Sequence, residues 1–291
     1  MNQQETALPE DIANSLTPIL YPDDLYRFDT VANSITGGFS SVRQTDIEYF
    51  HQNGYLVIED AFTDKEIEEA LAGMVYLMDG KNPDFRAIQF EAKLAKRKDE
   101  MKPKERRDAI RKIFNFVNHE SRLKALSEHE GLIQVLEQIM GDTPMLFQDM
   151  ALVKPPLHGT EKPWHQDCAY FNLAQGTTVV GVWIALDEAT AENGCMHIIP
   201  GSHNEGPMIH FNRRDWQICD TDVPIARDTM VPLQPGGCLF WHGLTHHGSP
   251  VNHSSKRRRA LQFHYKPASS GDISTQDRMD IFGSEGKDVD C

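Results

Sequence analysis

The chain has few cysteines and a shortage of basic residues, and both restrict what it can be. Its five cysteines, among 291 residues, are odd in number, widely spaced and contain no C-x-x-C pair. That pattern is typical of free thiols in a reducing compartment, not of a disulfide framework or a cysteine zinc cluster. There are 29 lysines and arginines against 43 aspartates and glutamates, so the formal net charge is -14. Such a chain is a poor ligand for nucleic acid or an anionic membrane, because phosphates attract positive charge.

Long apolar runs are also missing. The longest, residues 179–186, is far too short to cross a bilayer. The first residues lack the basic start and apolar stretch of a signal peptide. We therefore expect a cytoplasmic protein without nucleic-acid or membrane partners, whose ligands are small molecules. Nothing in the composition indicates how many subunits associate.

The overall composition is that of a globular protein, with 40% apolar and 25% charged residues, and it predicts a sizeable core. Residues 1–40 show no sustained periodicity and predict an extended arm over the fold. Residues 41–267 form one predicted domain, and residues 268–291 form a polar C-terminal tail.

The first part of the domain, residues 41–143, is mainly helical in pattern. S/T-x-x-E capping boxes at residues 45–48 and 63–66 each predict a helix start. Gly54 is expected to end the first helix, and residues 55–60 ("YLVIED") then predict a short strand.

A charged tract interrupts these patterns. Residues 91–112 are dense in lysine, arginine, glutamate and aspartate, which indicates a solvated helix or a mobile cover broken at Pro103. Residues 123–140 return to helical spacing, and Gly141 is expected to end it.

The character of the chain changes at residue 144. Short apolar or β-rich runs such as "MLFQDMALV", "VVGVWIAL", "CLFWH" and "ALQFHY" are separated by Gly, Pro, Asn and Asp as far as residue 267. This pattern predicts an all-β barrel or sandwich over residues 144–267, with the helices of residues 41–143 packed outside it.

One motif in the β-rich part contains the residues of a metal site. In "WHQDCAY" the histidine and the aspartate, His165 and Asp167, stand two residues apart. On a strand, successive side chains alternate between faces, so this imidazole and carboxylate would project together while Gln166 turns away. Most such pairs are merely hydrogen-bonded, so a metal site requires a third ligand.

The third ligand is expected from a distant strand. The segment "FWHGLTHHGSPVNHSSKRRRALQFHY" offers His242, His246, His247 and His253 as candidates, and distance along the chain does not choose among them. A set of two histidines and one carboxylate that leaves other positions open is typical of non-haem Fe(II) oxygenases.

The chain resembles the phytanoyl-CoA dioxygenase family of iron- and 2-oxoglutarate-dependent oxygenases over roughly residues 44 to 266. The matching segments are "FHQNGYLVIEDAFTDKEI", "KPPLHG", "WHQD", "GVWIALDEATAENGCMHIIPGSH" and "HHGSPVNHSSKRRRA". The resemblance implies a mainly β fold with flanking helices, built on a double-stranded β-helix (jelly-roll, cupin-like) core. It also implies Fe(II) and the cosubstrate 2-oxoglutarate as cofactors, with ascorbate as a reductant.

The family's pattern selects the distal histidine. There, this histidine is followed by Gly/Lys-Ser, then an Asn, then an Arg eleven residues on. His247 fits, with Ser249, Asn252 and Arg258 in register, whereas His246 loses the serine. The resemblance therefore implies that His247 completes the iron site and that Arg258 anchors the distal carboxylate of 2-oxoglutarate.

Arginine suits this task because its planar fork makes two parallel hydrogen bonds to a carboxylate. A basic run such as "KRRR" is more often a solvated patch. On a strand, however, Lys256 and Arg258 would share one face while Arg257 and Arg259 point the other way.

Four further positions complete the predicted site. The resemblance implies that Ser249 and Trp183 line the 2-oxoglutarate pocket and that Lys112 is the family's upstream cosubstrate lysine. Gln148, on the strand that leads to "VKPP", faces either the substrate or the core as a satisfied amide.

The expected reaction is hydroxylation of a C–H bond in a small molecule, with release of succinate and carbon dioxide. Two alternatives remain: a metal-dependent hydrolase with a bound water in the open position, and a non-catalytic jelly-roll binding protein. Because Lys112 ends the charged tract of residues 91–112, positive charge at the cavity mouth would attract 2-oxoglutarate and an anionic substrate. The tract is then a candidate lid.

Overall fold

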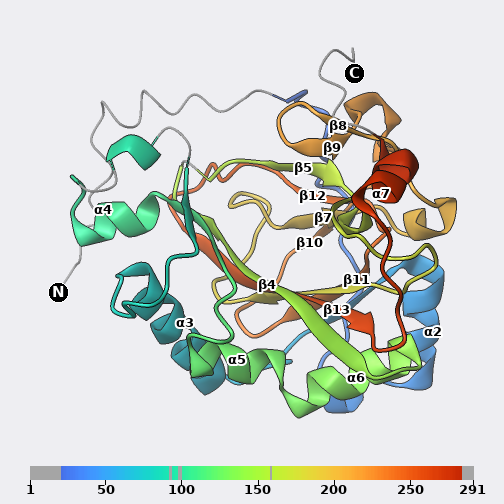
Figure 1. Cartoon of the computed structure of the whole chain (residues 1–291), viewed down its shortest axis with the longest axis horizontal. Coiled ribbons are helices and arrows are strands. Elements are labelled where there is room, and N and C mark those ends of the chain that lie inside the picture. The colour runs from blue at the N-terminus through green and yellow to red at the C-terminus, as the bar shows by residue number, and fades with distance from the viewer. Residues whose placement is uncertain (1–20, 92–93, 98–99, 158, 284–291) are drawn as a thin grey trace.

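The computed structural model of the protein describes residues 21–283, except for residues 92–93, 98–99 and 158. Strands dominate this part of the chain, and the helices lie outside them (Figure 1). The larger sheet has seven strands in the order β1 (Tyr55–Ile58), β11 (Cys238–His242), β6 (Val180–Ala185), β13 (Arg258–Pro267), β4 (Pro144–Lys154), β3 (Ile110–Phe114) and β2 (Ile88–Phe90).

A smaller sheet faces the inner side of the larger one. Its order is β10 (Thr229–Val231), β7 (Met196–Ile198), β12 (His247–Ser249) and β5 (Lys162–His165), and a separate hairpin pairs β8 (His210–Asn212) with β9 (Trp216–Ile218). Every pairing in these sheets is antiparallel. The predicted fold class, mainly β with flanking helices and a jelly-roll core, is confirmed.

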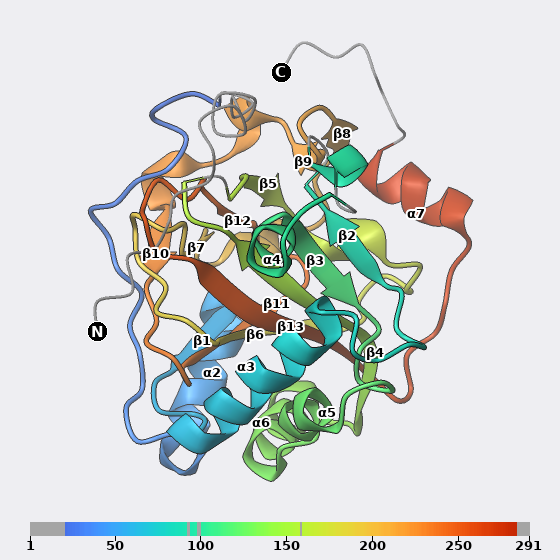
Figure 2. The same cartoon turned by 90° about the vertical axis from the view of Figure 1, so that its left-hand side faces the viewer.

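The α-helices within the described residues are α2 (Gln44–Asn53), α3 (Asp64–Met78), α4 (Pro103–Asp108), α5 (Ser121–Ser127), α6 (Glu130–Met140) and α7 (Thr275–Phe282). The short 3-10 helices are η1 (Phe39–Ser41), η2 (Ala95–Arg97), η3 (Asp167–Tyr170), η4 (Ser202–Glu205), η5 (Asp220–Asp222) and η6 (Ile225–Arg227). Figure 2 shows α2, α3, α5 and α6 together on the side of the large sheet that faces away from the small sheet.

The main hydrophobic core lies between these helices and the outer face of the large sheet. Alternation along β13 illustrates how the sequence divides the two faces. Leu261, Phe263 and Tyr265 pack in the core that includes α3, α5 and α6. Gln262 and His264 project to the opposite face, toward the space between the sheets. Burial of the apolar set fixes the register, because a slip of one residue would exchange the faces.

The predicted start of α3 is confirmed. Thr63 caps the helix: its Oγ1 accepts from the backbone N–H of Glu66, whose carboxylate accepts in turn from Thr63 N at 2.8 Å. The box predicted at Thr45 and Glu48 is wrong. Helix α2 begins at Gln44, because the carboxylate of Asp46 accepts the backbone N–H of Arg43 at 2.8 Å.

Helix α2 ends at Gly54 as predicted, since Gly54 adopts the left-handed conformation with φ 77°. The strand expected after it is present as β1, and it stops two residues before the predicted end. The helical pattern of residues 123–140 is divided between α5 and α6, and Gly141 caps the second with φ 64°.

The charged tract of residues 91–112 differs from the prediction. Its described part contains η2, the short helix α4 and the first half of β3, which is a strand of the large sheet. Pro103 does not break a helix but opens one, because the first turn of a helix needs no donor from the proline nitrogen. Three strands of the large sheet, β1, β2 and β3, therefore come from the part of the chain that precedes residue 144.

Both ends of the described chain are packed onto the domain. In the arm, Leu25 and Tyr26 are buried, and Ile35 forms a bridge with Ile58 of β1. In the predicted tail, α7 begins with a capping box in which Ser274 and Asp277 exchange hydrogen bonds. The remainder of the predicted arm and tail, residues 1–20 and 284–291, lies outside the described residues.

Candidate active site

The predicted metal ligands lie together between the two sheets. One side-chain ligand atom from each of His165, Asp167 and His247 lies within 4.8 Å of the others, and all three residues are buried. His165 ends β5 and His247 begins β12, and the two are direct partners across these antiparallel strands. Asp167 is not on the strand as predicted but opens η3. It still faces the histidines because Gln166, between the ligands, keeps an extended backbone with φ -113° and ψ 131°.

Backbone carbonyls orient both imidazole rings. Nδ1 of His165 lies 2.8 Å from the Pro163 carbonyl, and Nδ1 of His247 lies 2.9 Å from the Thr245 carbonyl. A carbonyl only accepts, so each Nδ1 donates and each Nε2 carries the free lone pair. Burial lowers the pKa of His165 to about 3, so this imidazole is neutral at physiological pH and can bind a metal ion.

Asp167 is surrounded by donors. Its Oδ2 accepts from Trp241 Nε1 at 2.8 Å and from His264 Nε2 at 2.9 Å, whereas its Oδ1 lies 3.5 Å from His165 Nε2. Burial raises the pKa of this carboxyl, but His247, His264 and the hydrogen bonds outweigh burial and hold it well below its usual value. The carboxylate is therefore ionised, as metal binding requires.

The other three candidate ligands, His242, His246 and His253, do not reach this site. The ring of His242 packs against His203 at 5.2 Å, and its Nδ1 accepts the backbone N–H of Leu244. His253 is exposed. His246 is buried, yet neither of its ring nitrogens has a hydrogen-bond partner among the described residues.

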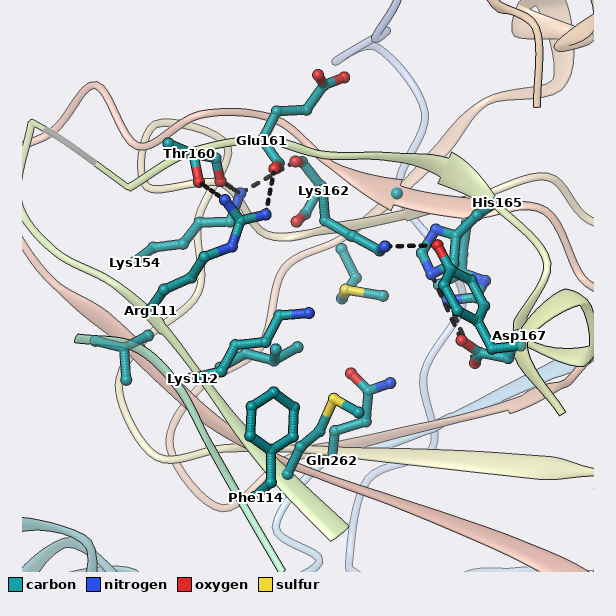
Figure 3. Close-up of a pocket in the computed structure, with 18 of the residues that line it drawn as sticks. Arg111, Lys112, Phe114, Lys154, Thr160, Glu161, Lys162, His165, Asp167 and Gln262 are labelled. Atoms are coloured by element: carbon teal, nitrogen blue, oxygen red, sulfur yellow. Dashed lines mark hydrogen bonds and ion pairs between the residues drawn. The ribbon is translucent and has the colours of Figure 1, made fainter. Parts of the chain in front are cut away.

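A cavity of about 230 Å³ opens beside the three ligands. Its lining contains five basic side chains, Arg111, Lys112, Lys154, Lys162 and Arg258, but only two carboxylates, Glu161 and Asp167. Most of these come from the two sheets that enclose the cavity, as Figure 3 shows for its labelled residues. In a chain with a net charge of -14, this local excess of positive charge indicates a site for anions.

Arg258, like Lys154, is a buried basic side chain of the cavity. Its Nη1 donates to the Gly194 carbonyl at 2.9 Å, and its guanidinium lies over the Trp183 ring at 5.2 Å. Two nitrogens here, Arg258 Nε and Trp183 Nε1, are buried without a hydrogen-bond partner among the described residues. Unsatisfied donors are costly in a protein interior, so the Nε of Arg258, which lines the cavity, favours a bound group that accepts hydrogen bonds, such as a carboxylate.

The neighbours of Arg258 are paired at the surface. Arg257 binds Asp108 at 2.5 Å, and Arg259 binds both carboxylate oxygens of Asp187 at 2.7 and 2.8 Å. The face-sharing predicted for Lys256 is wrong, because β13 begins only at Arg258 and Lys256 is an exposed residue that pairs with Glu188.

Lys112 projects from β3 into the cavity, and Figure 3 shows its amine near Gln262 and below Lys162. The described residues offer its Nζ no hydrogen bond or ion pair. Burial lowers the pKa of Lys112 to about 8, with smaller contributions in the same direction from Lys162 and Arg111. An unpaired ammonium in such surroundings gains most from a bound anion.

Three remaining predicted residues occupy different positions. Ser249 and Gln148 line the cavity. Trp183 is fully buried and meets the site through Arg258.

Several functional candidates were missed in the sequence. Trp241 and His264 bind Asp167, and Lys162 donates to Tyr170 and Asp215 at the cavity mouth. Alternation from Arg258 along the strand would have placed residues 262 and 264 on the same face as the anchor.

Comparisons with known proteins agree with this geometry. Residues 50–260 match the family described as "Phytanoyl-CoA dioxygenase (PhyH)". The chain is similar to a "Probable phytanoyl-CoA dioxygenase" of Caenorhabditis elegans, at 26% identity over 75% of this chain and 73% of the relative. It is also similar to "Phytanoyl-CoA dioxygenase, peroxisomal" of Bos taurus, at 26% identity over 76% of this chain and 67% of the relative.

A solved structure shares the fold. The epimerase SnoN, in complex with Fe3+, alpha ketoglutarate and nogalamycin RO, superposes with a TM-score of 0.63 at 18% identity, over 85% of this chain and 91% of the epimerase. At this identity the similarity concerns the arrangement of the sheets and helices.

Proposed function

Because the chain belongs to the phytanoyl-CoA dioxygenase family, it is a non-haem iron dioxygenase that uses 2-oxoglutarate, and we propose that it hydroxylates a C–H bond of a small molecule. The observation that supports this most directly is the pairing, in one basic cavity, of a buried two-histidine, one-carboxylate set with a buried arginine whose Nε lacks a partner among the described residues. A metal-dependent hydrolase has no use for that arginine.

We assign the iron to His165, Asp167 and His247. Their donor set is the one that non-haem Fe(II) oxygenases use, and it leaves positions open for other ligands. When bound, iron and 2-oxoglutarate would activate dioxygen: the oxo acid would lose carbon dioxide and take one oxygen atom to become succinate, and the other oxygen atom would enter the substrate as hydroxyl. The protein holds the ligands in place, since the carbonyls of Pro163 and Thr245 fix both rings.

We assign the cosubstrate carboxylate to Arg258. The partnerless Nε of Arg258 offers it a donor, Trp183 packs against this guanidinium, and the Ser249 hydroxyl lines the same cavity. Lys112 supplies a further positive charge. Arg258, Ser249 and Lys112 line one cavity with the metal ligands, which suits a short dicarboxylate that must reach both.

The substrate is proposed to be a small molecule with an anionic group. The side of the cavity away from Arg258 contains Phe114, Met150 and Gln148, which provide apolar contact and one amide. Lys162 lies at its mouth, paired with Asp215 at 2.8 Å. Since only part of the basic charge of the lining is matched by carboxylates, a second anion is favoured after 2-oxoglutarate has bound.

We also propose a cytoplasmic location. The described cysteines, Cys168, Cys195, Cys219 and Cys238, carry free thiols, which suits a reducing compartment. The bovine relative is named as peroxisomal, so a fluorescent fusion scored against a peroxisomal marker separates the two locations. Within the described residues, no helix is long and apolar enough to cross a membrane.

Succinate release from 2-oxoglutarate tests the function. Purified protein supplied with Fe(II), 2-oxoglutarate and ascorbate should form succinate, and a panel of anionic small molecules should include one that accelerates it. His247→Ala should abolish turnover and weaken metal binding, because it removes one of three ligands. His246→Ala is the matched control and should retain both. Zinc content with no succinate would indicate a hydrolase, and full activity in His247→Ala would move the metal site.

A further inference from the structure

We propose that His264 is a positioning residue, held by Gln262, that keeps the Asp167 carboxylate in a single orientation for the metal. The proposal rests on the proposed function, because it takes Asp167 as an iron ligand. It is carried by the hydrogen bonds that converge on one oxygen of this carboxylate.

The two oxygens of Asp167 have different surroundings. Oδ2 accepts from Trp241 Nε1 at 2.8 Å and from His264 Nε2 at 2.9 Å. It also lies 3.4 Å from His247 Nε2, but two donors already occupy its lone pairs. Oδ1 faces His165 and accepts a hydrogen bond from neither Trp241 nor His264. Oδ1 is therefore the oxygen left for a metal, and binding through one oxygen keeps positions open for cosubstrate and dioxygen.

His264 has surroundings that a packing residue would not need. It is 1% exposed, and its ring contacts Phe147, Phe171 and Trp241 at centroid distances of 5.0 to 6.2 Å. Its Nδ1 has no hydrogen-bond partner among the described residues. An apolar side chain would fill this space without an unsatisfied nitrogen, so the hydrogen bond from Nε2 is the reason for an imidazole here.

Gln262 lies two residues before His264 on the same face of β13, and its amide is 3.3 Å from His264 Nε2. That nitrogen carries a hydrogen, because it donates to a carboxylate oxygen that can only accept. The amide must then turn its oxygen toward His264, since the two ends of a carboxamide are assigned by their partners. The single Nε2–H is shared between its shorter bond to Asp167 Oδ2 at 2.9 Å and a longer one to Gln262 at 3.3 Å. Gln262 thus fixes the ring in the tautomer and orientation that serve Asp167.

Metal affinity tests the proposal without a known substrate. Apo-protein is titrated with Ni(II), a redox-inert metal, by calorimetry in the presence of 2-oxoglutarate. His264→Phe should weaken Ni(II) binding by about 10–100-fold, the usual effect of losing a hydrogen bond to a metal ligand. His264→Gln should recover most of this loss, because its amide can donate to Oδ2. His246→Phe, at a buried histidine away from Asp167, should bind as the wild type does.

A double-variant cycle tests the role of Gln262. Gln262→Leu should weaken Ni(II) binding by less than His264→Phe does. The combined variant should bind no more weakly than His264→Phe alone, because Gln262 acts through His264. Additive losses would show that Gln262 acts independently and would overturn this part of the proposal.

The outcomes separate this proposal from the proposed function. A wild-type protein that binds no Ni(II) contradicts the metal site itself. Wild-type binding that is unchanged in His264→Phe overturns the positioning role, and so do equal losses in His264→Phe and His264→Gln, because they indicate packing alone. If His264→Phe does not fold, as judged by circular dichroism, Trp241→Phe takes its place, because it removes the other donor to Oδ2. The Ni(II) affinity of His264→Gln is then compared with that of Trp241→Phe.

Discussion

At Arg258 a guanidinium is held out of water with only part of its hydrogen-bonding capacity in use. Burial lowers its pKa to about 10, so it is still charged at neutral pH. Arg258→Ala should raise the KM for 2-oxoglutarate strongly while Ni(II) affinity changes little, because the loss of a buried charge pair costs about 2–5 kcal/mol. Uncoupled succinate release at varied 2-oxoglutarate measures the effect.

Arg257→Ala is the matched control for that experiment. Arg257 precedes the anchor in the chain, but its guanidinium pairs with Asp108 outside the cavity. Its removal should leave the cosubstrate KM within about twofold of the wild type, since Arg257 does not line the cavity. An unchanged KM in Arg258→Ala would move the anchor to another cation of the cavity.

Lys112 predicts a pH dependence. Burial, then Lys162 and Arg111, lower its pKa to about 8, whereas Asp215 and Asp167 act in the opposite direction. The amine is charged below this pKa and neutral above it. The KM for 2-oxoglutarate should therefore rise as the pH increases from about 7 to 9, because an anion loses a positive partner.

Two variants isolate this effect. Lys112→Met should raise the KM at pH 7 and abolish its rise toward pH 9. Lys112→Arg should keep a low KM at both pH values, because a guanidinium stays charged throughout. A wild-type pH profile that persists in Lys112→Met would assign the titration to another group.

At the scale of elements, the charged tract of residues 91–112 remains a predicted lid. It is fastened at both ends: Thr160 Oγ1 accepts from Arg111 at 2.6 Å and donates to the Glu91 carboxylate at 3.3 Å. If the tract closes over ligands, tryptic cleavage within residues 94–107 should slow when 2-oxoglutarate and Ni(II) are added. Equal cleavage rates with and without them would make it a fixed cover.

The same tract shows where prediction from sequence failed. Strand β3 was not predicted because Arg111 and Lys112 gave it the composition of a solvated helix, although they face the cavity and its mouth. The capped helix α3 and the short β-rich runs were predicted because their signals are local. His165 and His247 lie on strands that are distant in the sequence, and local signals do not show which strands pair. Only the family pattern therefore selected His247.

At the scale of the whole molecule, the N-terminal arm packs against β5, the strand that carries the metal ligand His165. Tyr26 stacks on Trp164, next to His165, at 5.3 Å and donates to Glu161 Oε1 at 2.8 Å. Tyr26→Ala should lower the free energy of unfolding by about 3–5 kcal/mol, as other buried aromatic truncations do. Tyr26→Phe should cost only about 1 kcal/mol, the value of one hydrogen bond.

Urea unfolding monitored by circular dichroism measures these changes. Val31→Ala, at an exposed position of the same arm, should change the free energy of unfolding by less than about 0.5 kcal/mol. A Tyr26→Ala protein as stable as the wild type would show that the arm is an accessory and not part of the fold.

The order of the large sheet bears on how such an enzyme can acquire new substrates. Strand β13, which carries Arg258, Gln262 and His264, is central and paired on both sides, whereas β3 and β2 lie at one edge. Phe114, on β3, faces the part of the cavity assigned to substrate. Substitutions at this edge can therefore change the side chains that face the substrate, while the residues of the central strand that hold the cosubstrate and orient Asp167 stay the same. Specificity in this architecture can drift at little risk to catalysis.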